Sequence, residues 1–159
     1  MDLKKLTTSD KILFGAGLVF LISTFFNWFE VSIAGFTSVG ATGWDVGFFW
    51  AGLPFFTVLA MMIWVGVQRF SKTQLPTEIA PLYLVGGVGV ALIVLLKLII
   101  GEDGPIDRAF GLYLASIAAI GVAYAGFLKF QESGGNLNTL GSQLKAKAGE
   151  MGDKAKKKD

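Results

Sequence analysis

LYLVGGVGVALIVLLKLII, residues 82–100, carries a single charged side chain, Lys97, in an otherwise apolar run. A helix rises about 1.5 Å per residue, so roughly 20 such residues cross the hydrocarbon core of a bilayer, which is about 30 Å thick. Three more runs have similar character: Ile12–Phe29, Val46–Val67 and Phe110–Leu128. Backbone N–H and C=O groups need partners inside hydrocarbon, so each run should be a helix. We expect an all-α fold, a four-helix transmembrane bundle within residues 1–130.

The composition agrees with a membrane environment. Of the 159 residues, 53% are hydrophobic and 16% are charged, and the mean hydropathy is +0.59. Soluble domains carry about 25% charged residues. The connectors between the apolar runs are too short to fold into a soluble catalytic domain. Residues 131–159 are rich in Gly, Asn, Ser, Ala and Lys instead, and we expect a cytoplasmic polybasic tail that is partly amphipathic or disordered.

The basic residues predict the orientation of the bundle. Twelve of the fourteen Lys and Arg residues fall before the first run, between the second and third, or after the fourth. The two opposite connectors contain one basic residue, Arg108. Because cytoplasmic segments carry the excess of Lys and Arg, we predict a multi-pass protein of the cell membrane with both termini in the cytoplasm. This basic side should attract the anionic lipids of the inner leaflet, and it is not a sign of nucleic-acid binding.

The first outer connector predicts a short β-hairpin. Residues 30–39 alternate polar and apolar side chains around Ala34-Gly35, which is a hairpin pattern. Aromatic residues collect on both sides of it, and Asp45 is placed to cap the next helix. We expect Trp28, Phe36 and Trp44 to form an outer surface that contacts a partner.

Small residues recur every fourth position in the last run, at Gly111, Ala115, Ala119 and Ala123. This spacing lets a second helix approach the backbone closely. Two interpretations stay open at this point: a packing seam within the chain, and a seam for a homo-oligomer or another partner.

Polar side chains inside the runs also allow two interpretations. Ser23, Thr24 and Asn27 lie near the outer end of the first run, and Lys97 lies four residues before Gly101. Together they could line a solute path. Alternatively, the hydroxyls bond to neighbouring helices, and Lys97 extends to the outer interface toward Glu102 or Asp103.

Little in the sequence predicts chemistry. The chain has no histidine and no cysteine, so the commonest general base, the thiol nucleophile and most zinc and haem ligands are excluded. Glu102, Asp103 and Asp107 could hold a hard cation, but solvated loop charges are the simpler explanation. We expect no enzyme activity, no cofactor and no metal.

The sequence Phe26-Asn27-Trp28-Phe29 followed by Gly43-Trp44-Asp45 resembles the small four-span membrane proteins common in actinobacteria, a group without an assigned activity. The layout is also loosely similar to claudin-type tetraspans, with cytoplasmic termini and a longer, β-structured first outer loop. We therefore predict an accessory, scaffold or self-assembling subunit, present as a homo-oligomer or in a larger membrane complex. The alternative is an oligomeric channel or small transporter.

Overall fold

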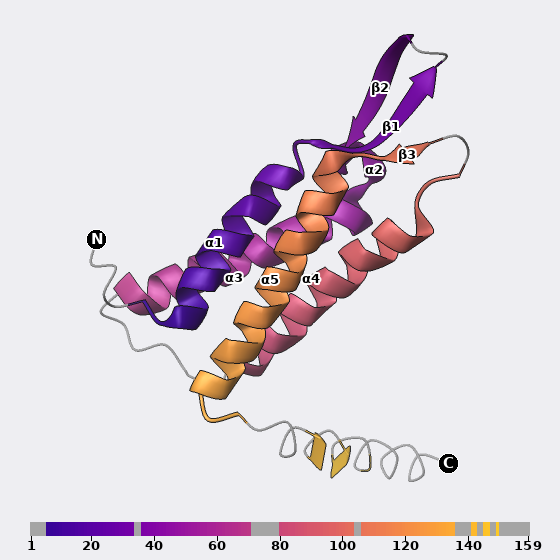
Figure 1. Ribbon diagram of the computed structural model, residues 1–159. Helices are drawn as coiled ribbons and strands as arrows, with labels where there is room; N and C mark the ends of the chain where they lie inside the picture. Colours follow the sequence, from indigo (N-terminus) through magenta and orange to yellow (C-terminus); the bar gives the residue numbers. More distant parts are fainter. Residues whose placement is uncertain are drawn as a thin grey trace.

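Four long helices and a small sheet make up the computed structural model, which describes residues 6–33, 36–70, 80–103 and 106–135 with a few positions beyond Gly135. The helices are α1 (Thr8–Ser23), α3 (Leu53–Phe70), α4 (Ala80–Ile100) and α5 (Phe110–Glu132). They run side by side, with the sheet at one end (Figure 1). We call this the sheet end, and the opposite end, where α1 and α4 begin and α3 and α5 finish, the basal end.

Three helices of the described part are long and apolar enough to cross a membrane: Phe48–Phe70, Pro81–Ile100 and Phe110–Glu132. Large apolar side chains point outward from them; Ile99 and Ile117, for example, are 73% and 70% exposed. An apolar surface of this kind suits lipid rather than water. The chain is therefore a membrane-embedded, mainly helical protein.

The first predicted span is wrong in its outer part. The sequence predicted a helix to Phe29, but α1 has 16 residues and ends at Ser23. The hydroxyls of Ser23 and Thr24 donate to the carbonyls of Phe20 and Leu21, within the last turn of the helix. The aromatic residues that follow enter a strand instead, and the Trp28 indole donates to the Ser23 carbonyl at 2.9 Å. The described structure thus shows three helices of spanning length, with α1 shorter.

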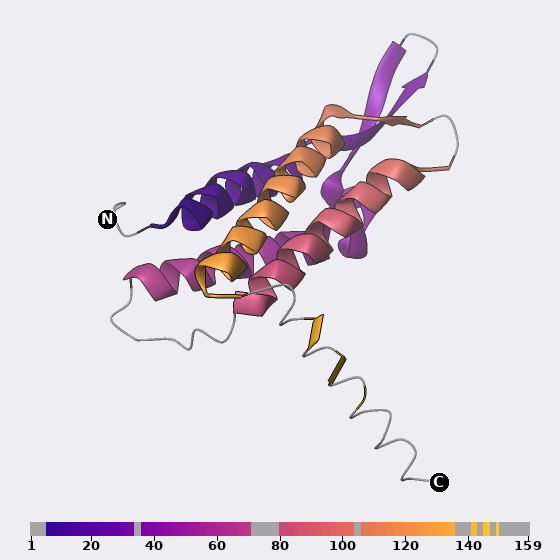
Figure 2. The ribbon, with the colours of Figure 1, turned by 60° about the horizontal axis from the view of Figure 1, so that its bottom comes forward.

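The predicted hairpin is confirmed. Strands β1 (Asn27–Ile33) and β2 (Phe36–Thr42) pair antiparallel, with Val31 opposite Val39. A third strand, β3 (Asp107–Arg108), pairs with the other edge of β1 and was not predicted. It joins the two connectors at the sheet end into one unit, which projects beyond the helices (Figures 1 and 2).

Helix α5 is the centre of the bundle. It lies between α1 and α4, and α3 packs against α1 and α4 (Figure 2). Close approach requires small residues: a Cβ added to Gly126 would lie 2.3 Å from the carbonyl oxygen of Tyr83 on α4. A Cβ on Gly87 of α4 would lie 3.0 Å from the Cα of Ala123. The backbones of α4 and α5 are therefore in direct contact.

The entry to α3 is irregular. A four-residue helix, α2 (Gly43–Val46), and a π-helix, η2 (Phe48–Gly52), precede it. The π-helix lies immediately before Pro54, whose missing N–H removes one helical hydrogen bond, and the Leu53 N–H donates to the carbonyl of Phe48. Gly47, between the two short helices, has a positive φ of 116°.

Candidate functional sites at the two ends of the bundle

The small-residue ladder packs inside the chain. Gly111, Ala115 and Ala119 are buried, and a Cβ on Gly111 would lie 2.6 Å from the carbonyl oxygen of Asn27. Ala123 faces Gly87 of α4. Of the two interpretations of this ladder, the structure favours the intramolecular seam. Burial of the first three residues and the contact of half-buried Ala123 with α4 leave little of this ladder for a partner.

The three residues of the predicted aromatic contact surface lie in different surroundings, and contact between Trp44 and a partner stays a prediction. Trp28 is completely buried, so its assignment as an outer contact residue was wrong. Burial of its ring and the hydrogen bond to Ser23 fix the junction between α1 and β1 instead. Phe36 lies on β2, and its side chain is outside the described side chains. Trp44 is 38% exposed and remains available.

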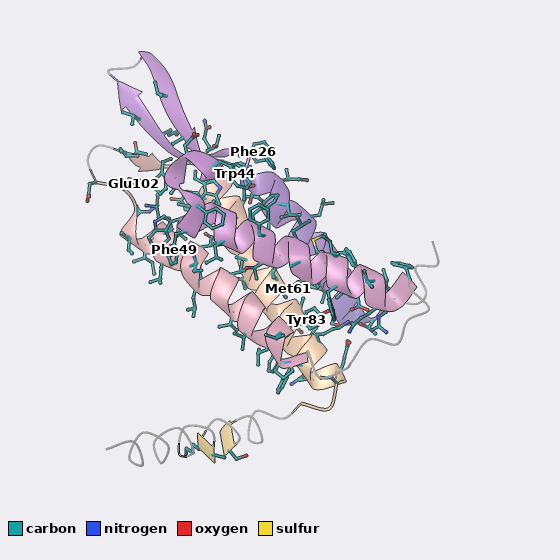
Figure 3. All side chains as sticks on the ribbon, turned by 180° about the vertical axis from the view of Figure 1, so that it is seen from behind. Phe26, Trp44, Phe49, Met61, Tyr83 and Glu102 are labelled. Carbon is teal, nitrogen blue, oxygen red and sulfur yellow. The ribbon has the colours of Figure 1, made fainter. Side chains whose placement is uncertain are left out.

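Trp44 is the centre of a connected group of rings at the sheet end, near Phe26 and Phe49 in Figure 3. Its ring centroid lies 5.0 Å from that of Phe55, 6.1 Å from Phe25 and 6.4 Å from Phe56. Phe48 extends the group through Phe56 at 6.1 Å. Such distances and the tilted or edge-on geometries are favourable for aromatic pairs. We call these five residues the Trp44 cluster; Phe25, Phe48 and Phe56 are more than half exposed.

Lys97 behaves as one of its two interpretations predicted. Its Nζ lies 2.6 Å from a carboxylate oxygen of Glu102 and donates to the carbonyl of Gly101 at 3.1 Å. The same ammonium lies 5.3 Å from the ring centroid of Phe29 and 5.1 Å from that of Trp50, within cation–π range. The side chain is only 6% exposed, while that of Glu102 is 37% exposed and faces the surface.

The other proposed path residues also have partners within the chain. Ser23 and Thr24 are buried and bond to carbonyls of α1. Asn27 lies on β1 with its side chain against Gly40 of β2. With Lys97 paired to Glu102, the described residues provide no support for a polar path through a single copy of the chain.

A second ionic site, at the basal end, was missed by the sequence reasoning. Asp10 of α1 is completely buried, and both of its carboxylate oxygens are bonded. One accepts from the Nε of Arg69 on α3 at 2.7 Å, and the other accepts from the Nζ of Lys129 on α5. Beside it, the Ser9 hydroxyl donates to Glu132 at 2.6 Å. This site ties α1 to α3 and α5.

The electrostatics of Asp10 follow from these contacts. Burial alone would raise its pKa, but the hydrogen bonds from Lys129, the Thr7 N–H and Arg69 outweigh that effect and lower it. Thr7 and Asp10 also form a capping box at the start of α1. The two cations lie 59 and 119 residues away in the sequence, so no local pattern indicates them.

Two buried polar atoms, one on α4 and one on α3, have no partner among the described residues. The Tyr83 hydroxyl on α4 and the Trp64 Nε1 on α3 are both sealed from solvent without a hydrogen bond within the described structure. The Lys129 ammonium lies 5.6 Å from the centre of the Tyr83 ring. We call Asp10, Arg69, Lys129 and Tyr83 the Asp10 cluster; Figure 3 shows Tyr83 far from Glu102, toward the basal end.

The acidic residues of the second outer connector are dispersed. Glu102 pairs with Lys97, and Asp107 lies in β3. Groups of three or more carboxylates close enough to hold a metal ion are not found among the described residues.

Comparison with known proteins assigns no family. No family model, curated protein or solved structure matches this chain. The function must therefore be argued from the geometry of the two ends.

Proposed function

We propose that this chain is a non-enzymatic integral membrane protein that acts by binding, as an accessory, scaffold or self-assembling subunit of a membrane complex. The observation that carries the proposal is the Trp44 cluster, which gathers exposed rings at one end of the bundle while the charged groups Asp10 and Lys97 are buried and paired. Aromatic side chains are enriched at contact surfaces because they bury a large area at a small entropic cost.

The proposed arrangement places the chain in the cell membrane with both termini in the cytoplasm. In it, α1 crosses the bilayer as a fourth span, with the aromatic residues after Ser23 at the outer headgroup level. The basal end, with Arg69 and Lys129, then faces the cytoplasm, in line with the distribution of basic residues.

Labelling of single cysteines tests this topology, because the natural chain contains no cysteine. Lys11→Cys is exposed in the first turn of α1, and Val39→Cys is exposed on β2. A membrane-impermeant maleimide should label the second variant on intact cells and the first only after permeabilisation. Labelling of both positions from the same side would show that α1 does not cross.

Copurification and photobleaching test the binding function. The full chain, carrying one fluorophore per copy, is counted in native membrane nanodiscs, and its partners are identified after crosslinking. We expect Trp44→Ala with Phe48→Ala to disperse the assembly. Phe110→Ala, which removes a 70% exposed ring outside the Trp44 cluster, is the matched control. A wild-type chain that is monomeric and without partners would refute the proposal.

The rival function, an oligomeric channel or small transporter, has no feature in its favour among the described residues. It predicts a specific result nevertheless. Lys97→Leu should change solute flux in reconstituted vesicles if Lys97 belongs to a path, and should leave assembly and flux unchanged if the chain is a binding subunit.

A further inference from the structure

The Asp10 cluster contains more donors than acceptors. Two cations, Arg69 and Lys129, share the single buried carboxylate of Asp10, and the other carboxylate of the site, Glu132, is exposed and accepts from the Ser9 hydroxyl. The Tyr83 hydroxyl adds a donor without an acceptor among the described residues, although Tyr83 is only 4% exposed. A buried polar group without a partner is destabilising, and the Lys129 ammonium lies beside the ring of the same Tyr83. The cluster therefore favours one more acceptor, and an anionic acceptor suits its cationic donors.

The position of the cluster identifies the source of that anion. Arg69 is the second-last residue of the span Phe48–Phe70, and Lys129 lies three residues before the end of the span Phe110–Glu132. Tyr83 is in the first turn of the span Pro81–Ile100. The ends of spanning helices lie at the level of the lipid headgroups. The Arg69 side chain is 30% exposed, so this member of the cluster reaches that level on the α3 side.

Trp64 extends the donor set along the boundary of α3 and α4. A Cβ on Gly86 of α4 would lie 3.3 Å from the sulfur of Met61 on α3, which fixes the relative height of the two helices. Trp64 and Tyr83 each lie three residues from that contact, in the direction of the basal end. Trp64 and Tyr83 are therefore at about the same level along adjacent helices, and each has a buried polar atom without a partner among the described residues.

We propose that the Asp10 cluster binds the phosphate group of an anionic phospholipid, with Arg69 as the exposed ligand and the Tyr83 hydroxyl as a second donor. Arg presents a planar fork of donors that matches phosphate oxygens. Such binding is local and specific, unlike the diffuse attraction of the lysine-rich tail to any anionic surface. It requires that the chain be embedded in a bilayer, but not that it assemble with partners.

Tyr83→Phe is the decisive variant, because it removes only the hydroxyl and keeps the ring that Lys129 contacts. The purified full chain in a non-ionic detergent is titrated with phosphatidylglycerol, with phosphatidylcholine and with inorganic phosphate. Binding is followed by native mass spectrometry and by the rise in unfolding temperature. Tyr124→Phe, at a 54% exposed position of α5, is the control for loss of a phenol, and Lys11→Gln is the control for loss of a surface charge.

The expected effects have opposite signs with and without lipid. Without phosphatidylglycerol, Tyr83→Phe should be as stable as the wild type or more stable, because a buried hydroxyl without a partner is removed. With phosphatidylglycerol, its affinity should fall about tenfold, the value of a hydrogen bond to a charged group. The two controls should bind as the wild type does, and phosphatidylcholine should bind weakly to all.

Three results would overturn the proposal. The first is equal affinity of Tyr83→Phe and wild type for phosphatidylglycerol. The second is an equal loss in Lys11→Gln, which would indicate surface charge alone. The third is lower stability of Tyr83→Phe without lipid, which would show that the hydroxyl already bonds within the protein. If millimolar inorganic phosphate displaced phosphatidylglycerol, the site would bind phosphate from either source. If it did not, the site would be specific for the lipid. A monomeric chain that passes these tests would refute the assembly function and leave the lipid site intact.

Discussion

The two ends of the bundle bury opposite charges by different means. At the basal end the buried ion is an anion, Asp10, and its partners are two cations from helices far away in the sequence. At the sheet end the buried ion is a cation, Lys97, and its partners are a carboxylate five residues away, a carbonyl of its own helix end and two aromatic rings. The ionic contacts of the first site connect three helices, whereas the ion pair of the second lies within one helix end and only its ring contacts reach β1 and η2.

This difference indicates how much of the fold each site supports. Removal of a group from a site that joins separate helices leaves several buried charges unpaired at once. Removal of a group from a local site leaves neighbours that can turn toward water, as the 37% exposed carboxylate of Glu102 can. We therefore expect the basal end to determine stability and the sheet end to tolerate change.

The largest effect is expected for Asp10→Ala. The substitution leaves Arg69 and Lys129 without their shared acceptor and removes the capping box of α1. Breaking a buried pair costs about 3–5 kcal/mol, and the partial exposure of Arg69 places the expected loss near the lower limit, about 3 kcal/mol. The measurement is the free energy of unfolding in mild detergent. Asp103→Ala, an exposed position at the opposite end, should change it by less than about 0.5 kcal/mol.

A smaller effect, with an asymmetry, is expected at the sheet end. Glu102→Gln leaves the buried ammonium of Lys97 with one carbonyl and two rings, and should cost about 1–2 kcal/mol. Lys97→Met removes the buried charge itself and leaves an exposed carboxylate, so it should cost less than Glu102→Gln. If Lys97→Met lost more unfolding free energy than Glu102→Gln, the ammonium and its contacts with the two rings would be necessary for the fold. That result would contradict the expectation that the sheet end tolerates change.

The same distinction between local and distant contacts explains what the sequence could predict. Lys97 and Glu102 are five residues apart, so their pairing was within reach of sequence reasoning. The partners of Asp10 depend on how three helices rotate and pack, and no spacing in the chain reports that. In the sequence analysis, Arg69 and Lys129 counted only among the basic residues that predict the topology. A search for opposite charges at the same predicted membrane depth would have found the group.

The helices and the hairpin could be predicted because each depends on a pattern of neighbouring residues. The errors occur where an apolar run and a strand pattern overlap. Leu82–Ile100 is apolar except for Lys97, and α4 matches it within two residues. The predicted first span was wrong after Ser23, where α1 ends. The apolar run continues to Phe29, but Asn27 and Phe29 pair with β2. Strand β3 has two residues and no pattern of its own, and it depends on the free edge of β1. The tail leucines Leu137, Leu140 and Leu144 lie outside the described residues, so their amphipathic helix stays a prediction.

Trp28 gives a third test of the difference between the two ends, because its hydrogen bond to Ser23 is uncharged and joins residues close in the sequence. Trp28→Phe keeps most of the buried ring but loses the 2.9 Å hydrogen bond to Ser23 and leaves a small void. We expect a loss of about 1–2 kcal/mol in unfolding free energy, less than for Asp10→Ala. Trp44→Phe, at an exposed ring of the Trp44 cluster, should have little effect on stability, which separates the buried tryptophan from the one proposed to bind a partner.

The smallest effect concerns two copies of the same local motif. Thr7-x-x-Asp10 begins α1 and Thr42-x-x-Asp45 begins α2, each with a capping box. The pKa of both carboxyls lies below the ordinary value of 3.8: hydrogen bonds from the side chain and backbone of Thr42 lower that of Asp45, and for Asp10 the contacts with Lys129, Thr7 and Arg69 outweigh burial.

A carboxyl whose pKa is lowered in the folded state stabilises the protein above its unfolded pKa, and that contribution is lost as the pH falls through the folded value. Unfolding measured from pH 7 to pH 3 should therefore show an acid-induced loss that Asp10→Asn flattens strongly. Asp45→Asn should flatten it only slightly, because Asp45 is fully exposed and has no cationic partner among the described residues. Equal flattening by the two variants would contradict the comparison: it would mean that the capping box, and not the cations from α3 and α5, holds the charge of Asp10.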